Sequence, residues 1–243
     1  MKLSSLLMPA LAAAAPSSFS SRPKALIYRG PAACNGCPES VAHLLKSSSY
    51  KFEVTYAGPK EKVDIDESSL DKVDIVAFPG GPDLNKNWRR SVHTYAPAVR
   101  SFVSNGGIYM GFCLGAYFAG DGYFGLLPDN STCAEECNQP GAQVTNRANT
   151  MIQVDWTFAA GPKAGTTEER WAFFQDGPVI KLKGDAGTAD GAKILARYAS
   201  DNDIAATLTP YGKGWVANTG AHLEADKSWC KRRDINLDRE LDS

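Results

Sequence analysis

The chain has 243 residues, with 26 Lys and Arg against 27 Asp and Glu and a hydrophobic fraction of 43%. This length is enough for one large α/β domain with a sizeable core. The balanced charge excludes a broadly basic nucleic-acid-binding protein, and three histidines leave little room for a His-rich metal site. We predict a globular domain with no nucleic-acid partner, no metal and no cofactor.

The first 16 residues have the three regions of a secretory signal peptide: one positive residue, a short apolar stretch and then small residues. The apolar stretch is too short to span a bilayer, which takes about 20 residues. We expect a signal peptide at 1–20, one domain at 22–230 and a polar tail at 231–243. The protein would then be secreted and not bound to a membrane. The alternative is an apolar N-terminal helix that frays.

Strands and helices alternate in the first half of the chain. In order, the sequence predicts a strand at 24–29, a helix that opens at Pro38-Glu39, strands at 52–57 and 73–78, a helix near 95–104, a strand at 107–112 and a helix directly after Cys113. Because the strands are near-continuous apolar runs, this pattern is typical of a doubly wound, mostly parallel sheet.

The second half has few helical periods and many short strand candidates separated by Gly, Pro, Asp and Asn. The expected strands lie at 151–159, 171–174, 179–182, 194–200, 204–208 and 214–218. We predict that they form β-hairpins appended to the sheet or inserted in it. The expected fold class is therefore α/β with additional hairpins in the C-terminal half.

The most informative motif is Gly-x-Cys-x-Gly between an apolar strand and a helix. Gly111 and Gly115 would permit a sharp turn without side-chain clashes, and Cys113 would project from it as a nucleophile. The backbone N–H of Leu114 would face the attacked carbonyl as an oxyanion donor. The alternative is a buried structural cysteine beside a tight turn.

A thiol nucleophile needs a base, and histidine is the usual one. His43 falls on a predicted helix and His93 in a polar stretch, whereas His222 follows the last predicted strand. The carboxyl ends of parallel strands meet at one edge of a sheet, so His222 and Cys113 are expected to converge there. Glu224 lies two residues on and would orient the imidazole.

Paired glycines end the strand at 73–78, in Pro79-Gly80-Gly81-Pro82. Their backbone N–H groups can approach a ligand closely, so Gly80 or Gly81 is a candidate for the second oxyanion donor. The alternative is an ordinary tight turn. With Cys113 and His222, three strand ends would supply one acyl-transfer site.

These motifs together resemble the class I glutamine amidotransferase superfamily. Within it, the chain is similar to the biotin-protein ligase N-terminal-like domain, in a secreted and chiefly fungal form, on the motifs Leu26–Pro31, Pro38–Val41, Phe78–Gly81 and Gly111–Gly115. The resemblance runs from about residue 24 to residue 224. It implies a flavodoxin-like fold with Cys113 as nucleophile, His222 as base and Glu224 as its partner. It implies no particular substrate.

Two close cysteine pairs remain, Cys34 with Cys37 and Cys133 with Cys137. In an oxidising compartment, disulfides are the favoured interpretation, either within each pair or as two cross-links between the loops, with a four-thiolate zinc site or a redox role as alternatives. Cys230 is left over. Secretion would also make the triplet that begins at Asn130 a candidate glycosylation site.

Three functions are compatible with these residues. The first is a secreted amidase-like hydrolase that acts on a small amide or peptide through a thioester on Cys113. The second is a non-catalytic binding domain that keeps the turn for packing. The third is a thiol-redox protein similar to the ThiJ/PfpI group, in which a histidine commonly follows the cysteine where this chain has Leu114.

Overall fold

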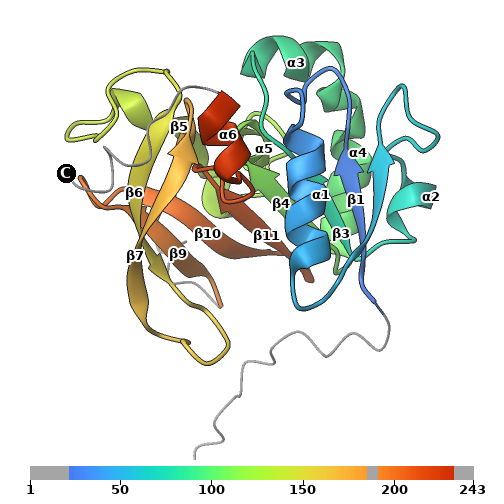
Figure 1. Ribbon diagram of the computed structural model, residues 1–243. Helices are drawn as coiled ribbons and strands as arrows, with labels where there is room; N and C mark the ends of the chain where they lie inside the picture. The colour runs from blue at the N-terminus through green and yellow to red at the C-terminus, as the bar shows by residue number, and fades with distance from the viewer. Residues whose placement is uncertain (1–21, 185–190, 233–243) are drawn as a thin grey trace, which may run out of the picture.

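The structure is a computed structural model that describes residues 22–184 and 191–232 (Figure 1). The predicted signal peptide at 1–20 and nearly all of the predicted tail at 231–243 lie outside these residues. No helix in the described part of the chain is long and apolar enough to cross a membrane.

The strands form one large sheet and one small one. In chain order they are β1 (Lys24–Tyr28), β2 (Glu53–Ala57), β3 (Ile75–Phe78), β4 (Ile108–Phe112), β5 (Thr132–Glu135), β6 (Thr150–Thr157), β7 (Thr167–Phe174), β8 (Pro178–Lys181), β9 (Lys193–Tyr198), β10 (Ile204–Tyr211) and β11 (Gly214–Thr219). The large sheet has the order β2-β1-β3-β4-β11-β10-β9-β6-β7, and β5 pairs with β8 separately.

Neighbouring strands from β2 to β11 are parallel, and those from β11 to β7 are antiparallel. This confirms the predicted α/β class, with a parallel sheet in the first half and antiparallel strands added in the C-terminal half. Because β11 returns to pair in parallel with β4, the last strand of the chain lies in the middle of the sheet.

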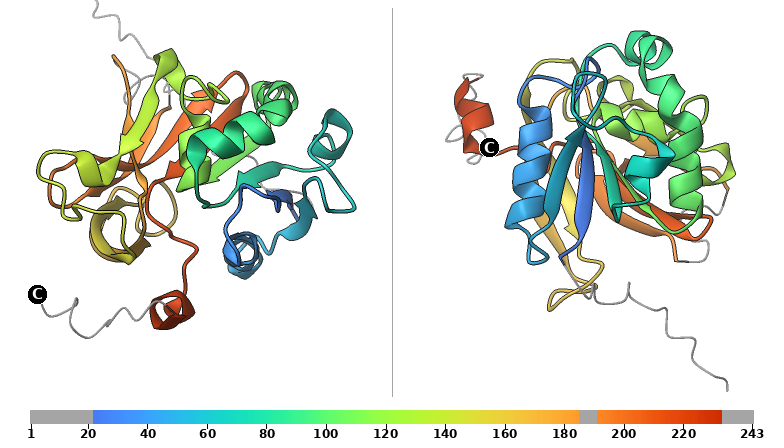
Figure 2. Two further views of the ribbon diagram at one scale, coloured as in Figure 1. Left: turned by 90° about the horizontal axis from the view of Figure 1, so that it is seen from above. Right: turned by 90° about the vertical axis from the view of Figure 1, so that its right-hand side faces the viewer.

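Helices cover both faces of the parallel strands. They are α1 (Cys37–Ser47), α2 (Glu67–Leu70), α3 (Leu84–Arg90), α4 (Ala96–Ser104), α5 (Leu114–Ala119) and α6 (Lys227–Arg232), with short 3₁₀ segments at Val92–Tyr95, Pro128–Asn130 and Glu136–Asn138. The right-hand view of Figure 2 shows α1, in blue, on one side of the parallel strands and the green helices on the other.

The alternation of side chains along the strands creates two cores. Ile27 of β1 packs with Val41 and Leu45 of α1 on one face. On the other face, an aromatic cluster packs against α4 and α5; its members include Tyr28, Phe78, Tyr109, Phe118 and Phe124. A strand whose two faces are both buried must be apolar throughout, and this is why the sequence pattern revealed β1, β3 and β4 clearly.

Besides the short helices α2 and α6 and the 3₁₀ segments, three parts of the fold were not predicted. The first half of β7, from Thr167 to Arg170, is polar and mostly exposed, so it has no apolar alternation that marks a strand. Helix α3 is short and polar, and β5 has four half-buried residues in the segment that the sequence marked only by its cysteines. In each case, pairing or packing with distant segments determines the structure.

Candidate active site

Cys113 lies at the turn between β4 and α5, with φ of 49° and ψ of −104°. A positive φ is strained for a residue with a Cβ, and such strain concentrates at functional sites. The flanking glycines are required sterically: a Cβ on Gly115 would lie 1.9 Å from the carbonyl oxygen of Phe78, and one on Gly111 would lie 2.5 Å from Oδ1 of Asn218. The local geometry is therefore that of a nucleophile elbow.

His222 follows β11, the strand that neighbours β4 in the sheet. Its backbone N–H donates to the carbonyl of Phe173 at 2.9 Å, which ties this segment to β7. The imidazole ring lies 5.6 Å from the ring of Phe173 and 5.1 Å from that of Trp229, measured between centroids. Aromatic neighbours on two sides hold the ring in one orientation.

Glu224 binds the imidazole. Nδ1 of His222 lies 2.8 Å from Oε1 of Glu224, and the Glu224 side chain is fully buried. Burial by itself lowers the pKa of His222, but the Glu224 carboxylate and the Cys113 sulfur raise it to about 10. Because Nδ1 is bound to the carboxylate, Nε2 is the nitrogen left for proton exchange at the sulfur.

A cavity of about 1090 Å³ opens above these groups. Cys113, Leu114, His222 and Gly81 line its base, and the thiol of Cys113 donates to the carbonyl oxygen of Gln175 at 3.6 Å. The structure thus brings the predicted nucleophile, the predicted base and two predicted oxyanion donors to one cavity.

The two glycines of the turn after β3 have different positions. Gly81 lines the cavity, and a Cβ there would lie 1.8 Å from the carbonyl oxygen of Ala32. Gly80 lies against the imidazole, where a Cβ would be 2.6 Å from Cε1 of His222, and its carbonyl accepts the N–H of Cys34 at 2.9 Å. Gly81 and Leu114, whose N–H opens α5 and has no partner within the helix, are the better placed donors. Gly80 makes room for the base.

Residues 24–123 match a family model, and its description is "Biotin-protein ligase, N terminal". The resemblance based on the motifs is thereby confirmed. The matched stretch includes Gly80, Gly81, Cys113 and Leu114 and stops well before His222. No curated protein sequence matches the chain significantly.

Solved structures extend the likeness to most of the chain. PurLQS from Thermotoga maritima has a TM-score of 0.56 at 18% identity, over 84% of this chain and 88% of that one. A glutamine amidotransferase from Thermotoga maritima has a TM-score of 0.55 at 13% identity, over 91% and 86%. A glutamine amidotransferase from Methylobacillus flagellatus has a TM-score of 0.50 at 16% identity, over 88% and 77%. Identities this low show a shared fold.

Only one of the two close cysteine pairs forms a disulfide in the structure. A disulfide joins Cys34 to Cys37, and Cys34 lines the cavity. The expected pairing of Cys133 with Cys137 is wrong, because both are free thiols. The sulfur of Cys133 donates to the carbonyl of Ala116 at 3.4 Å, whereas that of Cys137 contacts Oδ1 of Asp176 at 3.8 Å. The two side chains therefore have separate partners.

Replacing both Cys34 and Cys37 with alanine should lower the free energy of unfolding by about 2 kcal/mol, because the bond closes a short loop and restricts the unfolded chain. Urea unfolding of the variant and of the wild type, each with and without reductant, measures this. Reduced wild type should unfold like the variant. Equal stability of the variant and the oxidised wild type would contradict the assignment of the bond.

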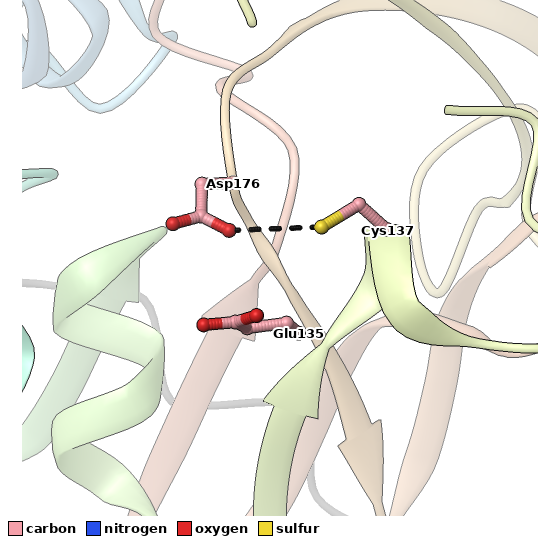
Figure 3. A group of neighbouring side chains, drawn as sticks. All are labelled: Glu135, Cys137 and Asp176. Carbon is pink, nitrogen blue, oxygen red and sulfur yellow. Dashed lines mark hydrogen bonds between the residues drawn. The ribbon is translucent and has the colours of Figure 1, made fainter. Parts of the chain in front are cut away.

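Charged side chains form the rim of the cavity. Figure 3 shows Glu135, Cys137 and Asp176 close together, with Cys137 and Asp176 pointing toward one another. Although these residue types can bind metal, Arg147 already pairs with Glu135 at 2.5 Å and with Asp176 at 3.4 Å. Burial also raises the pKa of Cys137, which disfavours the thiolate that a metal needs. This cluster is therefore an ion-paired part of the rim.

Sequence reasoning missed several residues that line the cavity. Tyr117 and Tyr123 follow the elbow and contribute to the wall, as do Arg147 and Gln175 from the C-terminal half. No motif marks any of them, because their positions depend on how the loops fold over the sheet. Asn130, the candidate glycosylation site, is exposed, and its modification stays a prediction.

Proposed function

We propose that the protein is a secreted amide hydrolase that forms a thioester acyl-enzyme on Cys113 with a small amide or peptide. The main support is that the strained elbow of Cys113 and the imidazole of His222 lie at one cavity. Nδ1 of this imidazole binds the buried carboxylate of Glu224. A glutamine amidotransferase-like fold is compatible with amide hydrolysis. The leader-like first residues and the Cys34–Cys37 disulfide support secretion.

In this mechanism the Cys113 thiol gives its proton to Nε2 of His222 as the sulfur attacks the amide carbonyl carbon, and the backbone N–H groups of Gly81 and Leu114 stabilise the oxyanion. His222 then donates its proton to the leaving nitrogen, so the C–N bond breaks and an amine or ammonia departs. A water molecule gives a proton back to His222 and attacks the thioester, which releases the acid and restores the thiol. Glu224 holds the imidazole in position in each step.

The cavity limits the substrate class. Its volume is suited to a small polar molecule or a short peptide segment, since typical ligand pockets span about 300 to 1,000 Å³. The wall offers tyrosine rings from Tyr117 and Tyr123, and the rim offers both a guanidinium from Arg147 and carboxylates from Glu135 and Asp176. A polar amide with groups of both charges fits this lining better than an apolar one.

A thiol-redox function is the second candidate, because the Cys34–Cys37 disulfide contributes to the wall of the same cavity as the Cys113 thiol. In that function the Cys113 sulfur would attack a substrate disulfide, form a mixed disulfide with one of its sulfurs and release the other as a thiol. A phosphine reductant removes a mixed disulfide and, because it has no thiol to exchange, leaves a thioester intact. Intact-mass measurement with and without reductant therefore separates the two candidates.

Iodoacetamide should alkylate Cys113 at about pH 6, where a free thiol with a pKa near 8.5 hardly reacts. The reason is that protonated His222 stabilises a negative charge on the neighbouring sulfur. Peptide mapping measures the rate at each cysteine. Cys133 lines the same cavity, and burial raises its pKa to about 12, so it serves as the slow internal control. If Cys113 reacts no faster than a free thiol, the proposed activation is wrong.

A further inference from the structure

A second cluster of carboxylates lies away from the cavity. Glu136 is completely buried, and its carboxylate lies within 4.8 Å of those of Asp201 and Asp203. Glu136 follows β5, whereas the two aspartates lie in the turn between β9 and β10. The cluster therefore joins two segments that are far apart in the sequence.

Three carboxylate oxygens of this cluster receive no hydrogen bond from an N–H or hydroxyl group of the described residues. They are both oxygens of Glu136 and Oδ2 of Asp201, all of them buried. The Glu136 and Asp201 carboxyl groups lie within hydrogen-bond reach of each other. Oδ1 of Asp201 accepts the backbone N–H of Asp203 at 2.9 Å, and Oδ2 of Asp203 pairs with Nζ of Lys181 at 2.7 Å. Among the described residues, the three carboxylates of the cluster thus have one ion-pair partner, Lys181, which contacts Asp203. Buried anionic oxygens without partners are costly, so the cluster favours a further positive charge.

We propose that Glu136, Asp201 and Asp203 bind a hard divalent cation of the calcium type. All the donor atoms are oxygens, which Ca²⁺ prefers and which soft metals do not. Carboxylates can bind Ca²⁺ with one or both oxygens in irregular geometry, whereas Mg²⁺ demands a near-ideal octahedron. Asp201 and Asp203 are partly exposed, which gives the ion a path from solvent.

The contrast with the rim cluster supports this choice. In that cluster Arg147 pairs with both acidic side chains and supplies them with a positive charge. In the part of the chain that the structure describes, no guanidinium pairs with Glu136. The backbone N–H of Glu136 donates to the carbonyl of Gly177 at 3.2 Å, next to the rim residue Asp176. A cation at Glu136 would therefore also stabilise one side of the cavity.

The test is calcium binding by the full chain after treatment with a chelator, measured by calorimetry and by thermal unfolding. We expect saturable binding at one site with a dissociation constant of about 10⁻⁴ to 10⁻³ M. At ten times that concentration the melting temperature should rise by about 3 to 6 °C. No saturable heat up to about 10 mM Ca²⁺ would overturn the proposal.

Two matched variants identify the ligands. Glu136→Gln keeps the shape of the side chain and should abolish the calcium-dependent rise in melting temperature. Without calcium it should melt at or above the calcium-free wild type, because it removes the electrostatic repulsion between Glu136 and Asp201. Asp155→Asn, which changes an exposed carboxylate on β6, should bind calcium like the wild type. Wild-type calcium binding by Glu136→Gln would show that Glu136 is only a buried protonated acid.

Discussion

Replacing Cys113 with alanine should lower kcat/KM for amide hydrolysis by about 10⁵-fold to 10⁶-fold, measured on the best substrate from a panel of small amides and peptide amides. The variant keeps the cavity and the oxyanion donors but has no sulfur to attack the carbonyl. It should also lose the acyl-enzyme adduct that intact-mass measurement detects in the wild type. The alanine has no polar atom to leave unpaired, so the fold should survive.

The matched control is Cys133→Ala, which removes another thiol from the same cavity wall. It should retain activity within a few-fold of the wild type. His222→Ala should be as inactive as Cys113→Ala, and the double variant should be no worse, because nucleophile and base act as a unit. Glu224→Gln keeps the imidazole in place without the charge and should cost about 10⁴-fold. Equal losses in Cys133→Ala and Cys113→Ala would contradict a nucleophilic role for Cys113.

Replacing Gly115 with alanine should lower the free energy of unfolding by at least about 3 kcal/mol. The new Cβ would lie 1.9 Å from the carbonyl oxygen of Phe78, and both atoms are held by backbone. The carbonyl of Gly115 also accepts the hydroxyl of Tyr109 at 2.6 Å in the core, so the turn cannot shift without breaking that bond. Urea unfolding measures the effect.

Gly120→Ala provides the control at the other end of the same helix. Gly120 has φ of −68°, which alanine adopts readily, and its nearest Cβ contact would be 3.3 Å. We expect a loss of about 1 kcal/mol or less there. If Gly115→Ala and Gly120→Ala were equally stable, helix α5 would not pack against β3 as closely as the structure shows.

The parts of the fold that could be predicted are those whose sequence carries a local signal. β3 and β4 are continuous apolar runs that end in glycine-rich turns, and both the strands and their turns lie where the sequence places them. The elbow could be located because its tight turn requires glycine on both sides of Cys113, and these two glycines can be read directly in the sequence. His222 could be selected because it follows the last predicted strand.

The remainder depends on contacts that no local pattern encodes. Arg147 reaches the rim because it pairs with Glu135 at the end of β5 and with Asp176 in the loop between β7 and β8. The spacing of Cys133 and Cys137 allowed a disulfide, but β5 pairs with β8 and gives the two sulfurs different partners. Such outcomes follow from tertiary packing alone.

The position of β11 between β4 and β10 determines when, during synthesis, the side chains of Cys113 and His222 can meet. Cys113 and Gly81 emerge from the ribosome long before His222, yet the base can meet the sulfur only after β11 has inserted beside β4. A nascent chain without this strand has an open edge in the centre of its sheet and a thiol without its base. Completion of the sheet is therefore the step that brings Cys113 and His222 together, so under the proposed function partly made chains would lack hydrolytic activity.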